Sequence, residues 1–495
     1  MQRFVLSLIG LTVIGLTGCA NSLQRDVEAA LSNPDHTGIR WGLVVADLSG
    51  EEILALKPDD RFTPASNTKI FTTMAAYQHL EALESPPNNP GTQIFVETVA
   101  DGTAPRLVLK GGGDATLLDT PDCESTCLAS LADQVASWGI DEVSAVVGDD
   151  TLFPFERWGP GWSQEDLTFY YGTAISALSV NDNVVWVDVI PGEAAGGPAR
   201  VSWQLGEDYF ELNNQLKTTT EEGDWAMRIE RLPGSQTVRF YGEIPAGTAA
   251  RSYRLAIENP ADYTAWRFKN LLEARGISVG EVVTRHRPLA LTDEAPPLDE
   301  PVKTAALTVY SEPASAAAAL PPGSLSASLK RISKDSQNLH ADLTLRRLGL
   351  LNGPGSRDYG VAELRAFLTA AGLPEHGYAV HGGSGMSIYN RVSPRSMVQL
   401  LAFAARQPWF ETWLADQPIG GVDGSLKHRF VGTALEGKIF AKTGTLNGAN
   451  ALSGVMVAKS GRRLLFSVLA NDRPNGTRSA IAEMDAALVE IAARY

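Results

Sequence analysis

The sequence predicts a mixed α/β protein in which one domain, an antiparallel sheet flanked by helices, is interrupted by a long β-rich insertion. The 495 residues are too many for a single compact core, so two or three domains are expected. Strand and helix patterns occur together near both ends of the chain, whereas short alternating segments dominate the middle. These observations indicate a discontinuous domain.

The first part of that domain is predicted from residues 40–83. Residues 40–56 show two strand-like runs around a Ser-Gly turn. Residues 67–83 carry apolar side chains at helical spacing, which predicts a helix facing the core. The Pro- and Gly-containing stretch 85–91 ends this helix and marks a boundary.

The insertion and the second part of the domain follow. Residues 92–283 are predicted as mostly strands, with helical breaks near 128–138 and 261–275. Residues 291–324 are rich in Ala and Pro and predict a hinge or an exposed connection. Beyond it, the expected elements are a helical region, strands and a final helix, at residues 324–350, 437–444, 451–472 and 478–495.

The charge balance restricts the possible partners. The formal net charge is −15, and no Lys/Arg block offsets it locally. A nucleic-acid-binding role is therefore set aside.

The N-terminus has the layout of an export signal. Arg3 precedes an apolar run, residues 4–16, that is short for a membrane span. Leu16-Thr17-Gly18-Cys19 resembles the bacterial lipobox, in which the cysteine is acylated and becomes the first mature residue. The alternative is an ordinary cleaved signal with an incidental cysteine. Residues 1–19 are thus expected to be a lipoprotein signal, and Ala20 after the cysteine favours the outer membrane by analogy.

The two other cysteines, Cys123 and Cys127, are four residues apart. An exported protein permits a disulfide, and this spacing brings the side chains together in a helix or turn. The alternatives are two free thiols or half of a metal site. The seven histidines are scattered, so we expect a structural disulfide and no metal.

A serine and a lysine three residues apart, Ser66 and Lys69, stand at the start of the predicted helix, and this is the single S-x-x-K in the chain. An oxyanion next to Ser66 would benefit from the free N–H groups and positive dipole at a helix start. Lys69, one turn later, can reach the hydroxyl and act as its base. The alternative is a capping serine and a solvated lysine.

Two further motifs follow in the chain. Lys442-Thr443-Gly444 occurs once, at a strand end, and Thr445 follows it; these residues offer a cation and hydroxyls to a carboxylate. S-x-N occurs twice, with its serine at Ser179 and at Ser336, so at most one copy is expected to be catalytic.

In this order S-x-x-K, S-x-N and K-T-G resemble the signature of penicillin-binding proteins and serine β-lactamases. If Ser336 is the second motif, 270 residues separate it from Ser66, which is too long for a compact class A β-lactamase. The chain therefore resembles the class C low-molecular-mass penicillin-binding proteins, the D-alanyl-D-alanine carboxypeptidase/endopeptidase family (peptidase S13, penicillin-binding protein 4 type). Six more stretches match its pattern, at residues 109–117, 176–183, 333–349, 382–394, 418–430 and 441–454.

The resemblance assigns roles to these motifs. It implies a penicillin-binding transpeptidase fold, a Ser66 acyl-enzyme, peptidoglycan stem peptides as substrate, inhibition by β-lactams, and no cofactor. It places Ser179 in the inserted region, so Ser336 and Asn338 are the expected catalytic pair. It implies the following site residues: Ser66, Lys69, Ser336, Asn338 and Lys442 as catalytic, with Thr443, Gly444 and Thr445 binding substrate.

The expected organisation is a catalytic domain formed by residues 20–84 and 311–495, and an inserted β-rich region of two subdomains at 85–310. Two alternatives to the peptidase remain open. A serine β-lactamase would differ in fast deacylation of a penicillin adduct. A non-catalytic peptidoglycan-binding lipoprotein would keep the cleft without turnover.

Overall fold

The computed structural model describes residues 23–495 except 33, 35, 36, 86, 87, 89, 99–103, 206, 207, 290–314 and 475–478. The described chain divides into two compact units. Unit 1 comprises residues up to 78, 329–336 and 365–495; unit 2 comprises 79–328 and 337–364. The lipobox with Cys19, and most of the predicted connection at 291–324, lie outside the described residues. No helix among the described residues is long and apolar enough to cross a bilayer.

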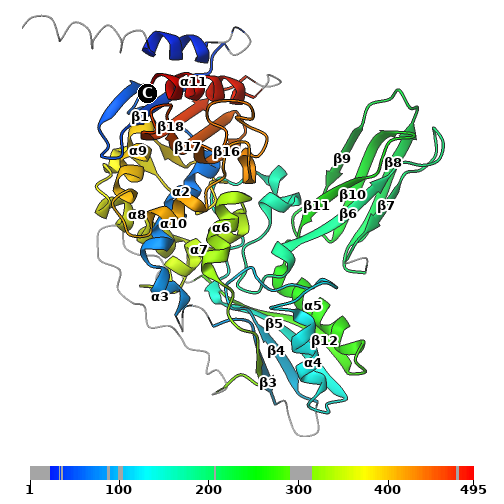
Figure 1. The fold of residues 1–495 in the computed structure, drawn as a ribbon. Coiled ribbons are helices and arrows are strands. Elements are labelled where there is room, and N and C mark those ends of the chain that lie inside the picture. Colours follow the sequence, from blue (N-terminus) through cyan, green and yellow to red (C-terminus); the bar gives the residue numbers. More distant parts are fainter. Residues whose placement is uncertain are drawn as a thin grey trace, which may run out of the picture. The chain divides into compact units, whose positions relative to one another are not determined.

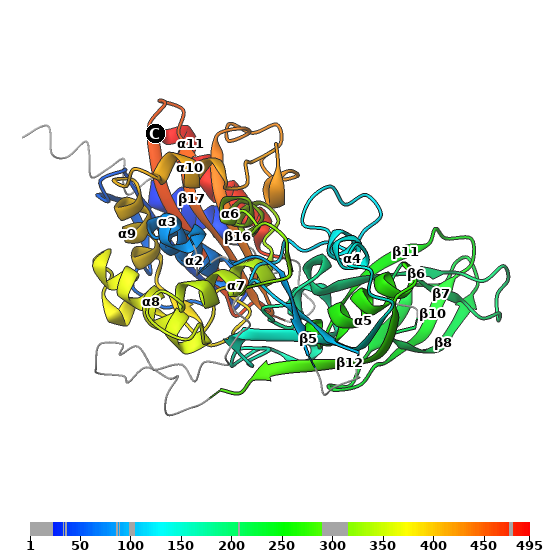
Figure 2. The same cartoon turned by 90° about the horizontal axis from the view of Figure 1, so that it is seen from below.

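Unit 1 is built on a five-stranded antiparallel sheet that joins segments from both ends of the chain (Figures 1 and 2). Its strand order is β16 (Ile439–Leu446), β17 (Ala449–Val457), β18 (Arg463–Asn471), β1 (Arg40–Ala46), β2 (Glu52–Leu56). Every strand pair is antiparallel. Successive residues of the central strands β17 and β18 are buried, and because successive side chains point to opposite faces, both faces of the sheet are covered by another layer.

Helices supply those layers. On one face, α11 (Ile481–Arg494) and the helical residues 23–31 share one apolar core with the sheet, which includes Leu452, Leu488 and Ile491. The other face carries α2 (Thr68–Gln78), α9 (Pro394–Ala404) and α10 (Phe410–Ala415) (Figure 2). The short strands β14 (Tyr378–Ala379) and β15 (Arg391–Val392) also belong to this unit.

The described residues of unit 2 form three sheets. The largest is mixed, in the order β12 (Ser278–Arg287), β5 (Glu142–Pro154), β4 (Arg106–Lys110), β3 (Gln93–Glu97), β13 (Ala318–Ala319). The second is β8 (Glu211–Thr219), β10 (Thr237–Pro245), β9 (Ala226–Glu230). The third is β11 (Arg251–Ala256), β6 (Val184–Ile190), β7 (Arg200–Trp203). The helices α4 (Leu128–Ala136) and α5 (Pro260–Glu273) pack with these strands in one apolar core.

Two predicted helices are each broken in the structure. The predicted helix 67–83 forms as α2 and α3 (Leu80–Glu84), because His79 leaves the helical region with φ −115° and ψ 19°. The helical region 324–350 forms as α6 (Leu325–Lys334) and α7 (Asn338–Leu348). Between them Ser336 has φ +58°, a left-handed conformation that ends α6. The helices α6 and α8 (Arg357–Ala370) each run across the boundary between the two units.

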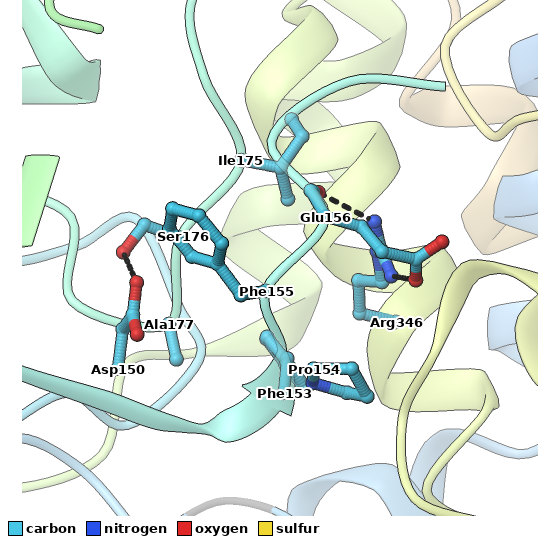
Figure 3. A pocket seen from close by; sticks show the side chains of 9 residues that line it. All are labelled: Asp150, Phe153, Pro154, Phe155, Glu156, Ile175, Ser176, Ala177 and Arg346. Atoms are coloured by element: carbon cyan, nitrogen blue, oxygen red, sulfur yellow. Dashed lines mark hydrogen bonds and ion pairs between the residues drawn. The ribbon is translucent and has the colours of Figure 1, made fainter. Parts of the chain in front are cut away.

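Helix α7 is fixed within unit 2 by a buried ion pair. Arg346 donates to the Glu156 carboxylate and, at 2.8 Å, to the Glu156 carbonyl, beside a small pocket (Figure 3). Burial alone would raise the pKa of Glu156, but the guanidinium groups of Arg346 and Arg357 outweigh it and hold that pKa below its usual range. Apolar contacts of Leu339 and Leu343 complete the packing of α7.

Candidate active site

The turn that carries Ser66 stands at the start of α2. A short 3₁₀ segment, η2 (Ala65–Asn67), precedes the helix, and Ala65 adopts φ +48°. This strained turn presents the Ser66 hydroxyl at the helix N-terminus, where the backbone N–H groups and the helix dipole favour negative charge. The local structure therefore places the serine in the environment that the sequence predicted.

Lys69 lies one turn into α2 and is completely buried. Its Nζ is 3.0 Å from Ser66 Oγ, and it donates to the Ser384 carbonyl at 2.5 Å. A second contact from α2 ties the same segment down, because Thr72 Oγ1 donates to the Gly383 carbonyl at 2.8 Å. Segment 383–385 thus positions the amine beside the hydroxyl.

Two glycines permit the close packing around the serine turn. A Cβ on Gly385, which has φ +91°, would lie 2.0 Å from Ala65 O and 3.1 Å from Ser66 N. A Cβ on Gly444 would lie 2.6 Å from Pro64 O. Gly444 of the K-T-G motif therefore has a packing role in addition to the ligand contact expected from sequence: it lets β16 lie against the turn that carries Ser66.

Lys442 points from β16 toward the second motif. Its side chain is buried, and its Nζ donates to Ser336 Oγ at 2.8 Å and to Thr443 O at 3.0 Å. Burial lowers the pKa of Lys442 to about 7, because the desolvated ammonium form is disfavoured. A hydroxyl joined to an amine that titrates near neutrality can pass a proton in either direction.

The hydroxyls after Lys442 lie at the exposed end of β16. Thr443 Oγ1 donates to Ser425 Oγ at 2.7 Å, and Thr445 Oγ1 accepts from Asn450 Nδ2 at 3.4 Å. Asn67, next to the serine, donates through Nδ2 to the Lys442 carbonyl at 2.9 Å. The S-x-x-K turn, Ser336 and the K-T-G strand are thereby joined within unit 1.

Asn338, the third residue of S-x-N, begins α7 and is assigned to unit 2. Its side chain is buried, and Nδ2 donates to the Tyr171 carbonyl at 2.7 Å. Its amide is thus oriented by the segment at residues 170–172. Ser336, the first residue of the motif, groups with unit 1.

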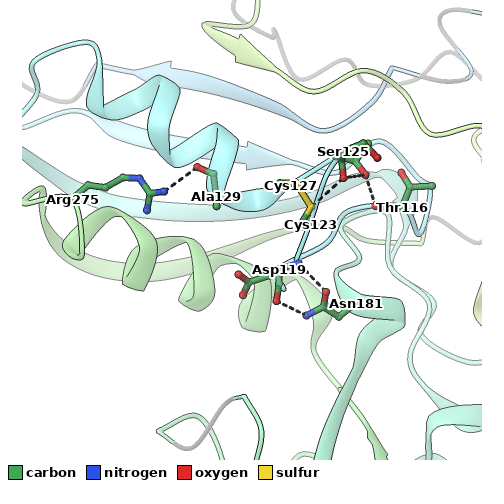
Figure 4. Close-up of a disulfide and its surroundings, with 9 residues drawn as sticks. Thr116, Asp119, Cys123, Ser125, Cys127, Ala129, Asn181 and Arg275 are labelled. Carbon is green, nitrogen blue, oxygen red and sulfur yellow. Dashed lines mark hydrogen bonds between the residues drawn. A yellow bond between two sulfur atoms is a disulfide. The ribbon is translucent and has the colours of Figure 1, made fainter. Parts of the chain in front are cut away.

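The other S-x-N copy is part of a buried turn. Ser179 Oγ donates to Ser176 O at 2.7 Å, while Asn181 exchanges two hydrogen bonds with the Asp119 backbone at 2.8 and 3.1 Å (Figure 4). These contacts give both side chains a structural role. Cys123 and Cys127 form a disulfide in the same region (Figure 4).

Some residues of this site had no role in the motif analysis. Ser384 contributes a carbonyl, which carries no side-chain signature. Ser425 lies beside Thr443, and Asp423, two residues earlier in the chain, forms an ion pair with Lys334 at the end of α6. The stretches 382–394 and 418–430 matched the family pattern, and that match was the available signal.

Comparison with known proteins identifies the family. The model of the D-Ala-D-Ala carboxypeptidase 3 (S13) family matches residues 23–495. The chain belongs to this family. It is 32% identical over 487 residues to the D-alanyl-D-alanine carboxypeptidase of Actinomadura sp. (strain R39), covering 95% of this chain and 84% of that protein. It is 24% identical over 465 residues to D-alanyl-D-alanine carboxypeptidase DacB of Haemophilus influenzae, covering 89% and 87%.

The fold of this S13 peptidase agrees with solved structures. It matches the crystal structure of penicillin-binding protein 4 from Haemophilus influenzae with a TM-score of 0.77 at 20% identity, covering 95% of this chain and 98% of that one. The complex of the same protein with a β-lactam matches with a TM-score of 0.72 at 18% identity, covering 95% and 98%. The predicted penicillin-binding fold and the predicted enzyme class, a serine D-Ala-D-Ala carboxypeptidase, are confirmed.

Proposed function

We propose that this S13 peptidase cleaves peptidoglycan stem peptides and cross-links through an acyl-enzyme on Ser66. The observation that carries the proposal is the contact between the buried Lys69 amine and the Ser66 hydroxyl at 3.0 Å, at a helix N-terminus. A nucleophile next to a base, on an electropositive helix end, is the arrangement that acyl transfer requires.

In the first step, Lys69 accepts the Ser66 proton while Oγ attacks the carbonyl between two D-alanines. The N–H groups of Ser66 and Thr445 form the oxyanion hole, in which fixed donors stabilise the developing negative charge. Burial separates the Lys69 amine from bulk water, so the proton stays in the site.

In the second step, the tetrahedral intermediate collapses and the D-amino acid amine leaves. Ser336 donates a proton to that amine and is reprotonated through Lys442, whose hydrogen bond of 2.8 Å and pKa near 7 suit both directions of transfer. Asn338 holds the substrate amide, and Thr443 and Thr445 hold the terminal carboxylate. Water then attacks the acyl-enzyme and gives a proton through Ser336 to Lys442, while Lys69 returns its proton to the Ser66 oxygen, so that Ser66 and both lysines are restored. A free D-alanine as leaving group makes the enzyme a carboxypeptidase, and a cross-linked residue makes it an endopeptidase.

The test uses the soluble form that lacks residues 1–19, together with its Ser66→Ala variant. Both are incubated with pentapeptide and cross-linked muropeptides, and the products are measured by mass spectrometry. We expect loss of D-alanine, or of the cross-link, with intact Ser66 alone. Cleavage that persists in a folded Ser66→Ala protein would overturn the nucleophile assignment.

We further propose that the protein is exported and anchored by an acylated Cys19, in the outer membrane where the cell has one. Cys19 precedes the helical residues 23–31 by four positions, a distance of at most ~14 Å in extended chain. Such a tether keeps unit 1 close to the bilayer surface. Radiolabelled palmitate should be incorporated into the wild type and not into Cys19→Ala. Release of the mature protein from membranes by salt alone would contradict the anchor.

A further inference from the structure

A loop before β16, residues 418–426, is fastened to the end of α6 by an ion pair. Lys334 Nζ lies 2.7 and 2.6 Å from the two carboxylate oxygens of Asp423, and it also donates to the Gln417 carbonyl at 2.6 Å. The Lys334 side chain is 12% exposed and that of Asp423 is 40% exposed, so the ammonium group is shielded from solvent while the carboxylate is partly open to it. Asp423 Oδ1 also accepts from the Ile419 N–H at 2.9 Å, which shapes the 418–426 loop itself.

Backbone packing reinforces the same junction. Gly424 has φ +56°, and a Cβ there would lie 2.9 Å from the Lys334 carbonyl. The loop therefore approaches the backbone of Lys334 as closely as only glycine allows. Lys334 is two residues before Ser336, so the 418–426 loop and the second motif share one anchoring point.

The start of the loop, residues 418–420, is hydrogen-bonded to β16, the strand that carries the K-T-G motif. The Ala441 N–H donates to Pro418 O at 3.0 Å, and the Gly420 N–H donates to Ile439 O at 3.0 Å. At the far end of the loop, Ser425 Oγ accepts from Thr443 Oγ1 at 2.7 Å. The loop thus connects the segment of Ser336 to the strand of Lys442 and Thr443.

The hydroxyl pair has a chemical consequence. When Thr443 donates its only hydroxyl proton to Ser425, the proton left for an incoming carboxylate is that of Ser425. Ser425 is exposed, so its hydroxyl can meet a ligand from solvent. A carboxylate is an acceptor only, and each added O–H donor strengthens its binding.

We propose that Ser425 donates to the terminal carboxylate of the substrate beside Thr445, that Thr443 acts on this carboxylate through its hydrogen bond to Ser425, and that the Lys334–Asp423 ion pair is the positioning element that holds Ser425 there. This inference rests on the proposed function, since it concerns the carboxylate of the same D-Ala-D-Ala substrate. The inference adds Ser425 to the residues that touch the substrate, and it adds the Lys334–Asp423 ion pair as a group that acts through Ser425.

The first test compares Ser425→Ala with wild type on two peptides that differ at the C-terminus, a free carboxylate and a carboxamide. A hydrogen bond to a charged group contributes about tenfold or more to binding, so we expect kcat/KM for the acid to fall about tenfold, mainly through KM. For the carboxamide we expect a change below about twofold. Ser460→Ala, an exposed serine at the β17–β18 turn, is the matched control and should leave both peptides unaffected.

The second test concerns the ion pair. Lys334→Met should lower kcat/KM for both peptides, because Ser336 and Ser425 lose their common anchor, and Lys334→Arg should restore most of it. In the Lys334→Met background, adding Ser425→Ala should no longer change the ratio between acid and carboxamide. Such non-additivity separates positioning from a general loss of stability. Thermal unfolding of each variant establishes that it is folded.

The assignment would be overturned if Ser425→Ala left the ratio of kcat/KM between the acid and the carboxamide unchanged, whether both values fall or neither does. If the wild type cleaves neither peptide, the proposed function fails, and Ser425 is then tested with benzylpenicillin and its methyl ester. A slower acylation by the free acid alone would still support Ser425, whereas equal rates in the variant and the wild type would refute it.

Discussion

Replacing Lys442 with methionine should change how the stability of the protein depends on pH. Complete burial lowers the pKa of Lys442 from 10.5 to about 7, whereas the same amine in the unfolded chain titrates at its ordinary value. Between these two pKa values the unfolded state binds one more proton than the folded state, so the free energy of unfolding of the wild type rises with pH across this window. Methionine keeps the length and the apolar stem without the titration.

The magnitude follows from the width of that window. Each pH unit inside it contributes about 1.4 kcal/mol, so from pH 7 to pH 9 the wild type should gain ~3 kcal/mol relative to Lys442→Met. Below pH 7 both states of the wild type carry the proton, and the variant avoids the buried charge. Below pH 7, Lys442→Met should therefore be more stable than the wild type by a few kcal/mol. The loss of the two hydrogen bonds to Ser336 and Thr443 reduces this gain by about 1 kcal/mol each.

The assay is denaturant unfolding of the soluble wild type and variant at pH 6, 7, 8 and 9, with the difference in unfolding free energy plotted against pH. Groups elsewhere titrate alike in both proteins and cancel in the difference. A difference in unfolding free energy that stays constant from pH 7 to 9 would refute the reasoning, because it would mean that Lys442 keeps its proton in the folded state at neutral pH.

Three other changes test the fold of the two units. Gly385→Ala should lower the rate of acylation by a fluorescent penicillin at least tenfold, because the added Cβ would meet the serine turn. Gly461→Ala is the control: Gly461 has φ +86° and no atom within 4 Å of an added Cβ, so this variant carries the same backbone strain and should leave the acylation rate unchanged. Glu156→Gln should destabilise the protein by about 3–5 kcal/mol in denaturant unfolding, since it leaves buried guanidinium groups uncompensated, and a loss below 1 kcal/mol would contradict the role given to this ion pair. Replacing both Cys123 and Cys127 with serine should cost about 2 kcal/mol or less, because the closed loop is short, and peptidase rates within twofold of wild type are expected.

The sequence predicted the elements whose signal is local. The apolar runs of β1 and β18 and the apolar stripe of α2 each identify their own structure, and S-x-x-K is recognisable because a serine and a lysine one helical turn apart must face each other. Family resemblance then selected Ser336 over Ser179, a choice that composition and spacing alone left open.

The contacts that involve backbone groups or distant segments could not be predicted in this way. The Ser384 carbonyl that receives the Lys69 amine lies 315 residues away and has no side-chain identity to recognise. The breaks at His79 and Ser336 are changes of backbone dihedral angle that helical periodicity does not reveal. The Lys334–Asp423 pair consists of two common charged residues, which become informative only when the fold brings them together.

The shared core of the helical residues 23–31 and α11 has a practical meaning for work with this protein. Leu23, Val27 and Leu31 share one apolar core with Leu488 and Ile491, and Arg494 pairs with Asp26. A recombinant protein shortened to its first strand at Arg40 would therefore expose an apolar strip on its last helix and tend to aggregate. Secretion vectors should therefore join their leader upstream of Leu23.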